Sequence, residues 1–234
     1  MNRTRSCGLL LLTATLLLAE NTPAWKTKPV EQWDNEDAKQ LLADSPWVGR
    51  ATLQVIPDRS PGERRDGGDW DAGVGGGLGL DVLLEIFTGG KRMDEATERA
   101  HRKPSPGTVQ IRWESAMPVR AAESKLGESS ASALHTGWYA ITLYDVPLPG
   151  KGWGEGKLKG LALLKRENKR DFKPSRVEIQ RQADGKATVT YLFSRSEEIS
   201  RRDPKVVFVA QLDRLFVSGF FYPATMQIAG QLEL

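Results

Sequence analysis

The chain has 234 residues, 39% of them hydrophobic and 27% charged, which fits one globular domain or two small ones. Its 33 basic and 30 acidic residues give a formal net charge of +3, and this balance gives no electrostatic case for binding nucleic acid. The single cysteine, Cys7, lies near the start, so the rest of the chain can form no disulfide, thiolate metal site or cysteine nucleophile.

Residues 1–24 have the pattern of a secretory signal peptide. Arg3 and Arg5 form a basic start, and an apolar run of residues 8–19 follows them. Small residues at Ala19 and Ala24 then offer cleavage sites. The apolar run is shorter than the roughly 18–20 residues that a membrane-spanning helix needs. We therefore expect a secreted or periplasmic protein with no membrane span in its mature chain.

A short helix and a strand are predicted next. Asp34 is placed to cap the helix, Asp37 occupies the capping-box position three residues later, and Ser45-Pro46 should end the helix. The segment 47–56 then has the composition of a strand. Its expected core contacts are Val48, Leu53 and Val55.

Residues 57–106 differ from the rest of the chain in composition. They contain several glycine clusters, the densest of them at residues 73–79. Glycine-rich backbone is hard to hold in one conformation, and loops of this length are usually functional or disordered. We interpret this segment as a flexible insertion between two pieces of one domain.

The segment 108–127 changes its periodicity part of the way along. Val109, Ile111 and Trp113 alternate with polar residues, which is the pattern of a half-buried strand. Ser115 could then cap a short helix that Gly127 would end, because glycine readily adopts the left-handed conformation found after helices.

Strands dominate the remainder of the chain. Residues 175–181 and 187–195 form two alternating runs separated by Ala183-Asp184-Gly185. A three-residue turn with Gly185 in the left-handed conformation pairs Ile179 with Val189, which keeps the apolar side chains on one face. Further strands are expected at residues 138–146, 205–211, 215–220 and 226–234, whereas the segment 158–165 fits a strand or a helix.

These elements predict an α+β domain with a mainly antiparallel sheet, arranged as a sandwich or a partly rolled barrel, and two or three short helices. We expect the capped helix to cover the apolar side of this sheet. The predicted organisation is a signal peptide (1–24), the first helix and strand of the domain (25–56), the flexible insertion (57–106) and the main β-rich part (107–234).

Catalytic and cofactor motifs are weak in this sequence. The two histidines, His101 and His135, have no cysteines to join them, so we predict no metal and no cofactor. A carboxylate pair for hydrolysis can come from anywhere in a chain, and Glu114 with Asp145 would be the candidates, since both lie on predicted strands with aromatic neighbours. No catalytic residue is assigned, and ordinary surface charges are the simpler interpretation of both.

Seven tryptophans are the unusual feature of the composition. Packing explains most of them, but Trp70 and Trp153 lie in glycine-rich segments with no local apolar neighbours. We therefore predict these two as candidate binding residues, because aromatic rings supply large contact areas with few rotamers. The expected partner is an envelope protein or a glycan.

The residues Gln32-Trp33, Glu36-Asp37-Ala38, Ser45-Pro46-Trp47 and Arg112-Trp113-Glu114-Ser115-Ala116 also resemble an uncharacterised family of exported bacterial proteins. The resemblance implies secretion but no activity and no functional residues. The function predicted from the sequence is thus an exported, non-enzymatic binding module of the periplasm or cell envelope. The alternatives are a secreted hydrolase with a carboxylate pair, and a structural subunit completed by a partner strand.

Overall fold

The computed structural model describes residues 22–55, 107–128, 137–148, 153–196, 198–212 and 215–234. Most of the predicted signal peptide and the whole of the predicted insertion, including Trp70 and His101, therefore lie outside the described residues, as does His135. In the described part of the chain, no helix is long and apolar enough to cross a bilayer.

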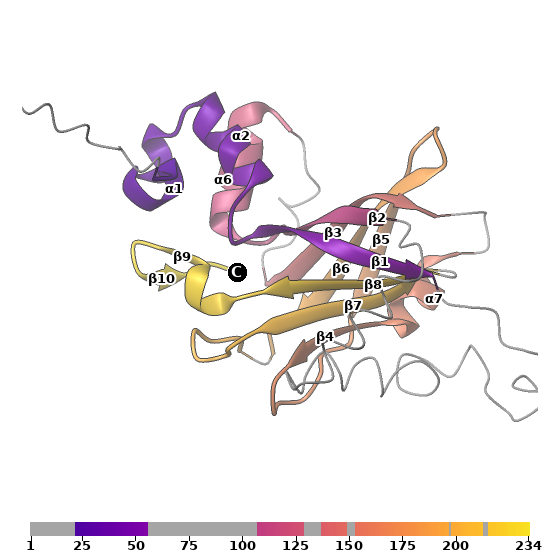
Figure 1. Ribbon diagram of the computed structural model, residues 1–234. Coiled ribbons are helices and arrows are strands. Elements are labelled where there is room, and N and C mark those ends of the chain that lie inside the picture. Colours follow the sequence, from indigo (N-terminus) through magenta and orange to yellow (C-terminus); the bar gives the residue numbers. More distant parts are fainter. Residues whose placement is uncertain (1–21, 56–106, 129–136, 149–152, 197, 213–214) are drawn as a thin grey trace, which may run out of the picture.

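The main feature of the fold is one eight-stranded antiparallel sheet, with strand order β4-β7-β8-β1-β2-β3-β6-β5 (Figure 1). The strands are β1 (Val48–Val55), β2 (Gly107–Trp113), β3 (Trp138–Pro147), β4 (Ala162–Arg166), β5 (Arg176–Arg181), β6 (Lys186–Ser194), β7 (Val206–Leu212) and β8 (Leu215–Phe221). The helices are α1 (Ala24–Thr27), α2 (Asn35–Ala43), α6 (Met117–Leu126) and α7 (Glu155–Gly160), with 3-10 turns η1 (Val30–Gln32) and η3 (Pro223–Thr225). The prediction of a mainly antiparallel α+β protein is confirmed.

The sheet curls into a half-barrel, so its apolar face packs largely against itself. Tyr191 of β6 and Phe208 of β7 are five strand spacings apart in the sheet, roughly 24 Å if the sheet were flat. Their ring centroids are 5.0 Å apart. Trp113 of β2 likewise meets Phe221 of β8 edge to face, at 5.0 Å. Of the two predicted arrangements, the partly rolled barrel is the one that forms.

Helices α2 and α6 pack against each other at one end of the sheet (Figure 1). Their buried residues, such as Leu41 and Val119, extend the same hydrophobic core. The expectation that the capped helix covers the apolar side of the sheet therefore needs correction, because α2 covers only one end of that side. The curl of the sheet buries the middle of that face, and the helix pair closes one end.

The local signals at the helix ends are mostly confirmed. Asp34 caps α2, and Asp37 completes the capping box. Gly127 ends α6 with φ +68°, in the left-handed region. Ser115 is not the cap, because the N-cap of α6 is Ala116 and the Ser115 hydroxyl instead accepts a hydrogen bond from the Ala140 N–H at 3.1 Å.

The predicted hairpin register is also confirmed. Ile179 pairs with Val189 and Val177 pairs with Tyr191, and Gly185 has φ +82° in the turn. This turn therefore places the apolar side chains of both strands toward the core.

Other sequence predictions need correction. Val55 is exposed, because the apolar side of β1 is formed by Ala51 and Leu53, which have the same parity as Val55 but lie further from the strand's end. The last segment forms a small hairpin, β9 (Gln227–Ile228) and β10 (Gln231–Leu232), in place of one strand. The ambiguous segment 158–165 is divided between α7 and β4.

Candidate functional site

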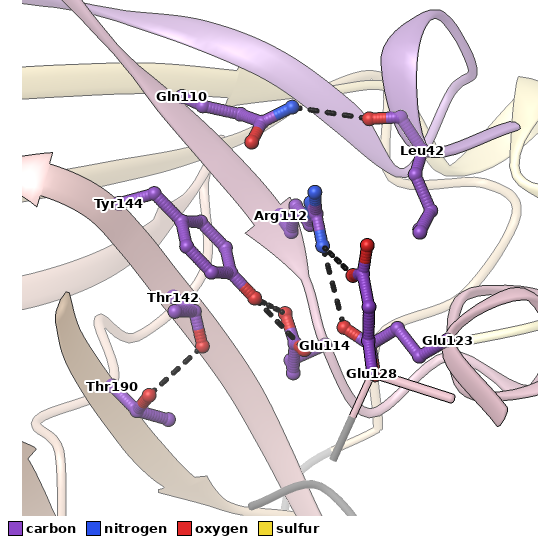
Figure 2. Close-up of polar contacts among 9 residues, drawn as sticks. All are labelled: Leu42, Gln110, Arg112, Glu114, Glu123, Glu128, Thr142, Tyr144 and Thr190. Carbon is purple, nitrogen blue, oxygen red and sulfur yellow. Dashed lines mark hydrogen bonds and ion pairs between the residues drawn. The ribbon is translucent and has the colours of Figure 1, made fainter. Parts of the chain in front are cut away.

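A cluster of charged and polar side chains lies where β2 ends and α6 packs against the sheet (Figure 2). Along β2, Val109, Ile111 and Trp113 are buried in the core, so the alternating residues point to the other face. Arg112 lies on that other face. Glu114, the next residue in the same alternation, is buried as well and belongs to the cluster.

Two carboxyl groups meet at the centre of this cluster. Glu114 follows β2, Glu123 is in α6, and their side chains are in hydrogen-bonding contact. The two residues are 3% and 2% exposed. Tyr144 of β3 donates its phenol hydrogen to the Glu114 carboxyl, with its Oη 3.0 Å from both Oε1 and Oε2. The pair is thus enclosed by a strand, a helix and an aromatic side chain.

Arg112 supplies the positive charge of the cluster. Its Nη1 lies 3.4 Å from Glu123 Oε1 and 3.8 Å from Oε2 of the exposed Glu128. Its guanidinium also lies over the Tyr144 ring, 4.5 Å from the ring centroid. One mostly buried cation therefore serves a buried carboxylate on one side and a solvent-facing carboxylate on the other.

The surroundings of Glu114 favour its neutral form. The pKa of Glu114 is raised from 4.5 to about 9, chiefly by burial and further by the hydrogen bond and negative charge of Glu123. The hydrogen bond from Tyr144 and the charge of Arg112 act in the opposite direction but are weaker. At neutral pH, Glu114 is therefore held as a carboxylic acid, while the Arg112 guanidinium pairs with Glu123 and with the solvent-facing Glu128.

Uncharged hydrogen bonds extend the cluster along the sheet (Figure 2). Gln110 Nε2 donates to the Leu42 carbonyl of α2 at 3.0 Å, which ties the helix pair to β2. The hydroxyls of Thr142 and Thr190 share a hydrogen bond of 2.9 Å between β3 and β6. These two hydrogen bonds thus connect α2 to β2 and β3 to β6.

The geometry of the carboxyl pair limits its chemistry. Retaining glycosidases hold their two carboxyl groups about 5 Å apart, and inverting ones further, so that substrate or water fits between them. The Glu114 and Glu123 groups touch each other and are shielded from solvent. This arrangement is suited to holding one proton between two groups.

In the structure the carboxyl partner of Glu114 is Glu123, and not the Asp145 that was predicted from the sequence. Asp145 is exposed, has φ +54°, and accepts a hydrogen bond from Gln182 Nε2 at 3.2 Å. The neighbouring residue, Tyr144, is the β3 residue that contacts Glu114. Glu123 was missed, although its position four residues after the apolar Val119 placed it on the buried side of the helix.

Trp153, one of the two predicted binding residues, is half-buried and packs against the core. The Lys157 ammonium lies 4.1 Å from the centroid of the Trp153 ring. The backbone carbonyl of Trp153 accepts a hydrogen bond from Arg181 Nη2 at 2.8 Å. These contacts explain how a tryptophan in a glycine-rich segment is held, and they leave less of its ring open than the sequence suggested.

A second group of aromatic residues is more exposed than Trp153. Phe220 and Tyr222 are 38% and 52% exposed. Phe221 between them is buried in the core, so the two exposed rings share the outer face of the sheet at the end of β8. The Lys205 ammonium lies 5.7 Å from the Phe220 ring centroid. Sequence periodicity does not reveal this pair, because exposure depends on what packs over the strand.

The described residues also form a surface depression but no metal-binding cluster. A shallow depression of about 370 Å³ lies beside the start of α2, lined by Trp33, Asp34, Asn35, Glu36 and Lys125. Among the described residues, no group of three or more histidine, cysteine, aspartate or glutamate side chains is arranged to hold a metal ion.

Together, the fold and the cluster define an α+β protein built on a curled antiparallel sheet, with a buried carboxyl pair under its helix α6. Comparisons with protein-family models, curated proteins and solved structures each give no match.

Proposed function

We propose that the protein is an exported binding module that recognises a glycan of the cell envelope through the outer face of its sheet. The observation that carries this proposal is the exposed pair Phe220 and Tyr222, with the Lys205 ammonium beside one ring. Aromatic side chains give a rigid contact surface at low entropic cost, and a neighbouring cation adds attraction for acidic groups.

The size of this surface favours a glycan over a protein. Stable protein interfaces bury roughly 800 Å² on each partner around several anchoring residues. Val55 is another exposed large apolar residue, but it pairs with Leu215, at the opposite end of β8 from Phe220. Among the described residues, the exposed large aromatic side chains are Phe220 and Tyr222, and two rings suit one or two sugar units.

A sedimentation assay with purified, insoluble peptidoglycan tests this proposal. We expect the wild-type protein to pellet with the polymer, and the double variant Phe220→Ala/Tyr222→Ala to stay in solution. Val55→Ala removes an exposed apolar side chain elsewhere and should bind like the wild type. Failure of the wild type to pellet, or equal retention of the double variant, would contradict the proposal. Capture of a specific envelope protein through these two rings would instead identify a protein partner.

Export itself is part of the proposal and rests on residues 1–24 of the sequence. The described chain starts at Thr22, and Trp25 in α1 meets Trp47 edge to face at 5.5 Å. Cleavage after Ala19 or Ala24 would leave this contact in the mature protein. Expression in a bacterium, followed by recovery from the periplasm and amino-terminal sequencing, tests both export and the cleavage position.

The hydrolase alternative is less well supported by the geometry. Its best candidates are now Glu114 and Glu123, and a substrate would have to reach two carboxyl groups that are almost entirely buried. The structural-subunit alternative requires a free sheet edge. The outer strand β5 carries Arg176, Glu178 and Arg181, and charged side chains of this kind discourage pairing with another strand.

A further inference from the structure

The contact between Glu114 and Glu123 joins the anchored end of a strand to helix α6, whose Val119 and Ala122 are also buried in the core. The N–H groups of Trp113 and Glu114 donate to the carbonyls of Trp47 and Ala140, both at 2.8 Å, so the backbone is anchored here. Glu123 lies in the second half of α6, a helix of ten residues. Since a helix satisfies its own backbone hydrogen bonds, α6 is held on the sheet by its side chains.

One retained proton limits the buried negative charge around this contact, because Glu123 and the solvent-facing Glu128 already share the Arg112 guanidinium. Three ionisable groups act on Glu114: Arg112 from β2, Tyr144 from β3 and Glu123 from α6. A fourth, Glu128 in the turn after α6, pairs with Arg112. Among the groups of the described chain that act on Glu114, Arg112 is the only cation. Loss of the proton would place two touching carboxylates, both buried, beside a single guanidinium.

We propose that the Glu114–Glu123 contact is a proton-linked latch, which seats α6 on the sheet while one proton is held between the two carboxyl groups and releases that proton when α6 moves away. The latch goes beyond glycan binding and does not depend on it. It is a conformational device that makes the position of α6 sensitive to pH.

The direction of the pH dependence follows from linkage. When α6 is seated, the pKa of Glu114 is about 9, and when α6 moves away and water reaches the side chain, the pKa returns toward 4.5. The seated state therefore binds more protons between these two values. The population of the open state should rise by up to about tenfold for each unit of pH in that window. The latch is strongest in acid and weakest in base.

Hydrogen exchange of the full chain at pH 6, 7 and 8 tests this proposal, once rates are corrected for the intrinsic pH dependence of exchange. In the wild type, protection of the amides of residues 117–126 should fall as pH rises, by up to about tenfold for each unit of pH. The β5–β6 hairpin serves as an internal reference that should not change. Glu114→Gln keeps the shape of the side chain but cannot ionise, so protection of α6 should lose its pH dependence. Asp145→Asn removes an exposed carboxylate from β3 and should behave like the wild type.

Two results would overturn the proposal: pH-independent protection of α6 in the wild type, or an unchanged pH dependence in Glu114→Gln. If that variant fails to fold, a carbon-13 NMR titration of the side-chain carboxyl groups in the wild type decides the question. A Glu114 carboxyl that titrates near pH 9 supports the latch, whereas one that titrates near pH 4.5 rejects it.

Discussion

The carboxyl groups of Glu114 and Glu123 touch each other in a site that is closed to water, and the Arg112 guanidinium contacts only the second of them as an ion pair. Burial and the lack of a direct ion pair among the described residues therefore favour the neutral form of Glu114. A buried, correctly paired charge is destabilising when its partner is lost, so each member of the cluster should have its own measurable effect on the free energy of unfolding.

Replacement of Glu123 by glutamine should lower the free energy of unfolding by about 3 kcal/mol, because Arg112 loses its buried counter-ion. Urea denaturation at pH 7 measures this change. Glu128→Gln is the matched control, since it removes the same charge from the exposed side of Arg112 and should cost less than about 1 kcal/mol. Equal effects of the two substitutions would show that the buried ion pair is not the stronger one.

Asp203 should support stability in the opposite pH range from Glu114. Burial disfavours its ionisation, but the Lys169 ammonium at 2.5 Å and the Ser200 N–H at 2.8 Å more than offset this and hold the pKa of Asp203 below 3.8. The stabilisation is therefore present above pH 3.8 and is lost as pH falls through the folded-state pKa.

Substitution of Asp203 by asparagine should cost about 2 kcal/mol at pH 7, and the difference from the wild type should shrink as pH falls below 3.8. Thermal unfolding followed between pH 2 and pH 7 measures this. Asp171→Asn, which removes a more exposed carboxylate paired with Lys165 at 3.2 Å, provides the control and should have little effect. A constant difference between Asp203→Asn and the wild type at every pH would contradict the assigned role.

Gly219 leaves room for the buried Ile111 side chain in the curled sheet. A Cβ atom at this position would lie 2.7 Å from Ile111 Cδ1, which is too close for an ordinary contact. Gly219→Ala should therefore lower the free energy of unfolding by about 1–3 kcal/mol. Gly49→Ala is the control, because its Cβ would lie at an ordinary 3.6 Å from Ile111 Cγ2.

A double-mutant cycle identifies the atom responsible. Ile111→Val removes Cδ1 and should cost about 1 kcal/mol alone, but it should recover much of the stability lost in Gly219→Ala. Strictly additive effects would show that the two side chains do not clash.

The capping box of α2 should contribute a smaller amount. Asp34 accepts a hydrogen bond from the Asp37 N–H at 2.9 Å, and its own N–H donates to Asp37 Oδ2 at 3.1 Å. Asp34→Ala should destabilise the protein by about 1 kcal/mol in chemical denaturation. Asn35→Ala, at the exposed next position, should be close to neutral, and an equal loss in both variants would argue against a capping role.

Much of the local structure could be predicted because its causes are local. The capping box of α2, the glycine end of α6 and the register of the β5–β6 hairpin each depend on residues that are close together in the chain. The prediction for Ser115 was wrong because a strand distant in sequence supplied an N–H that its hydroxyl could accept.

The candidate site was only partly predictable. Glu114 was singled out, but its partner Glu123 and the phenol of Tyr144 come from elements whose packing no sequence periodicity describes. The exposed rings of Phe220 and Tyr222 were not found for the same reason. Trp153 stays a predicted binding residue, and the Lys157 ammonium over its ring could not be predicted from the sequence.

The sequence by itself determined most of the strands and helices and the register of the β5–β6 hairpin, because alternation, capping and turn geometry act over a few residues. Only the tertiary structure decided that the sheet curls until Tyr191 meets Phe208, and that Glu114 meets Glu123. The physical reason is that curvature and the burial of charge depend on how whole elements fill space together.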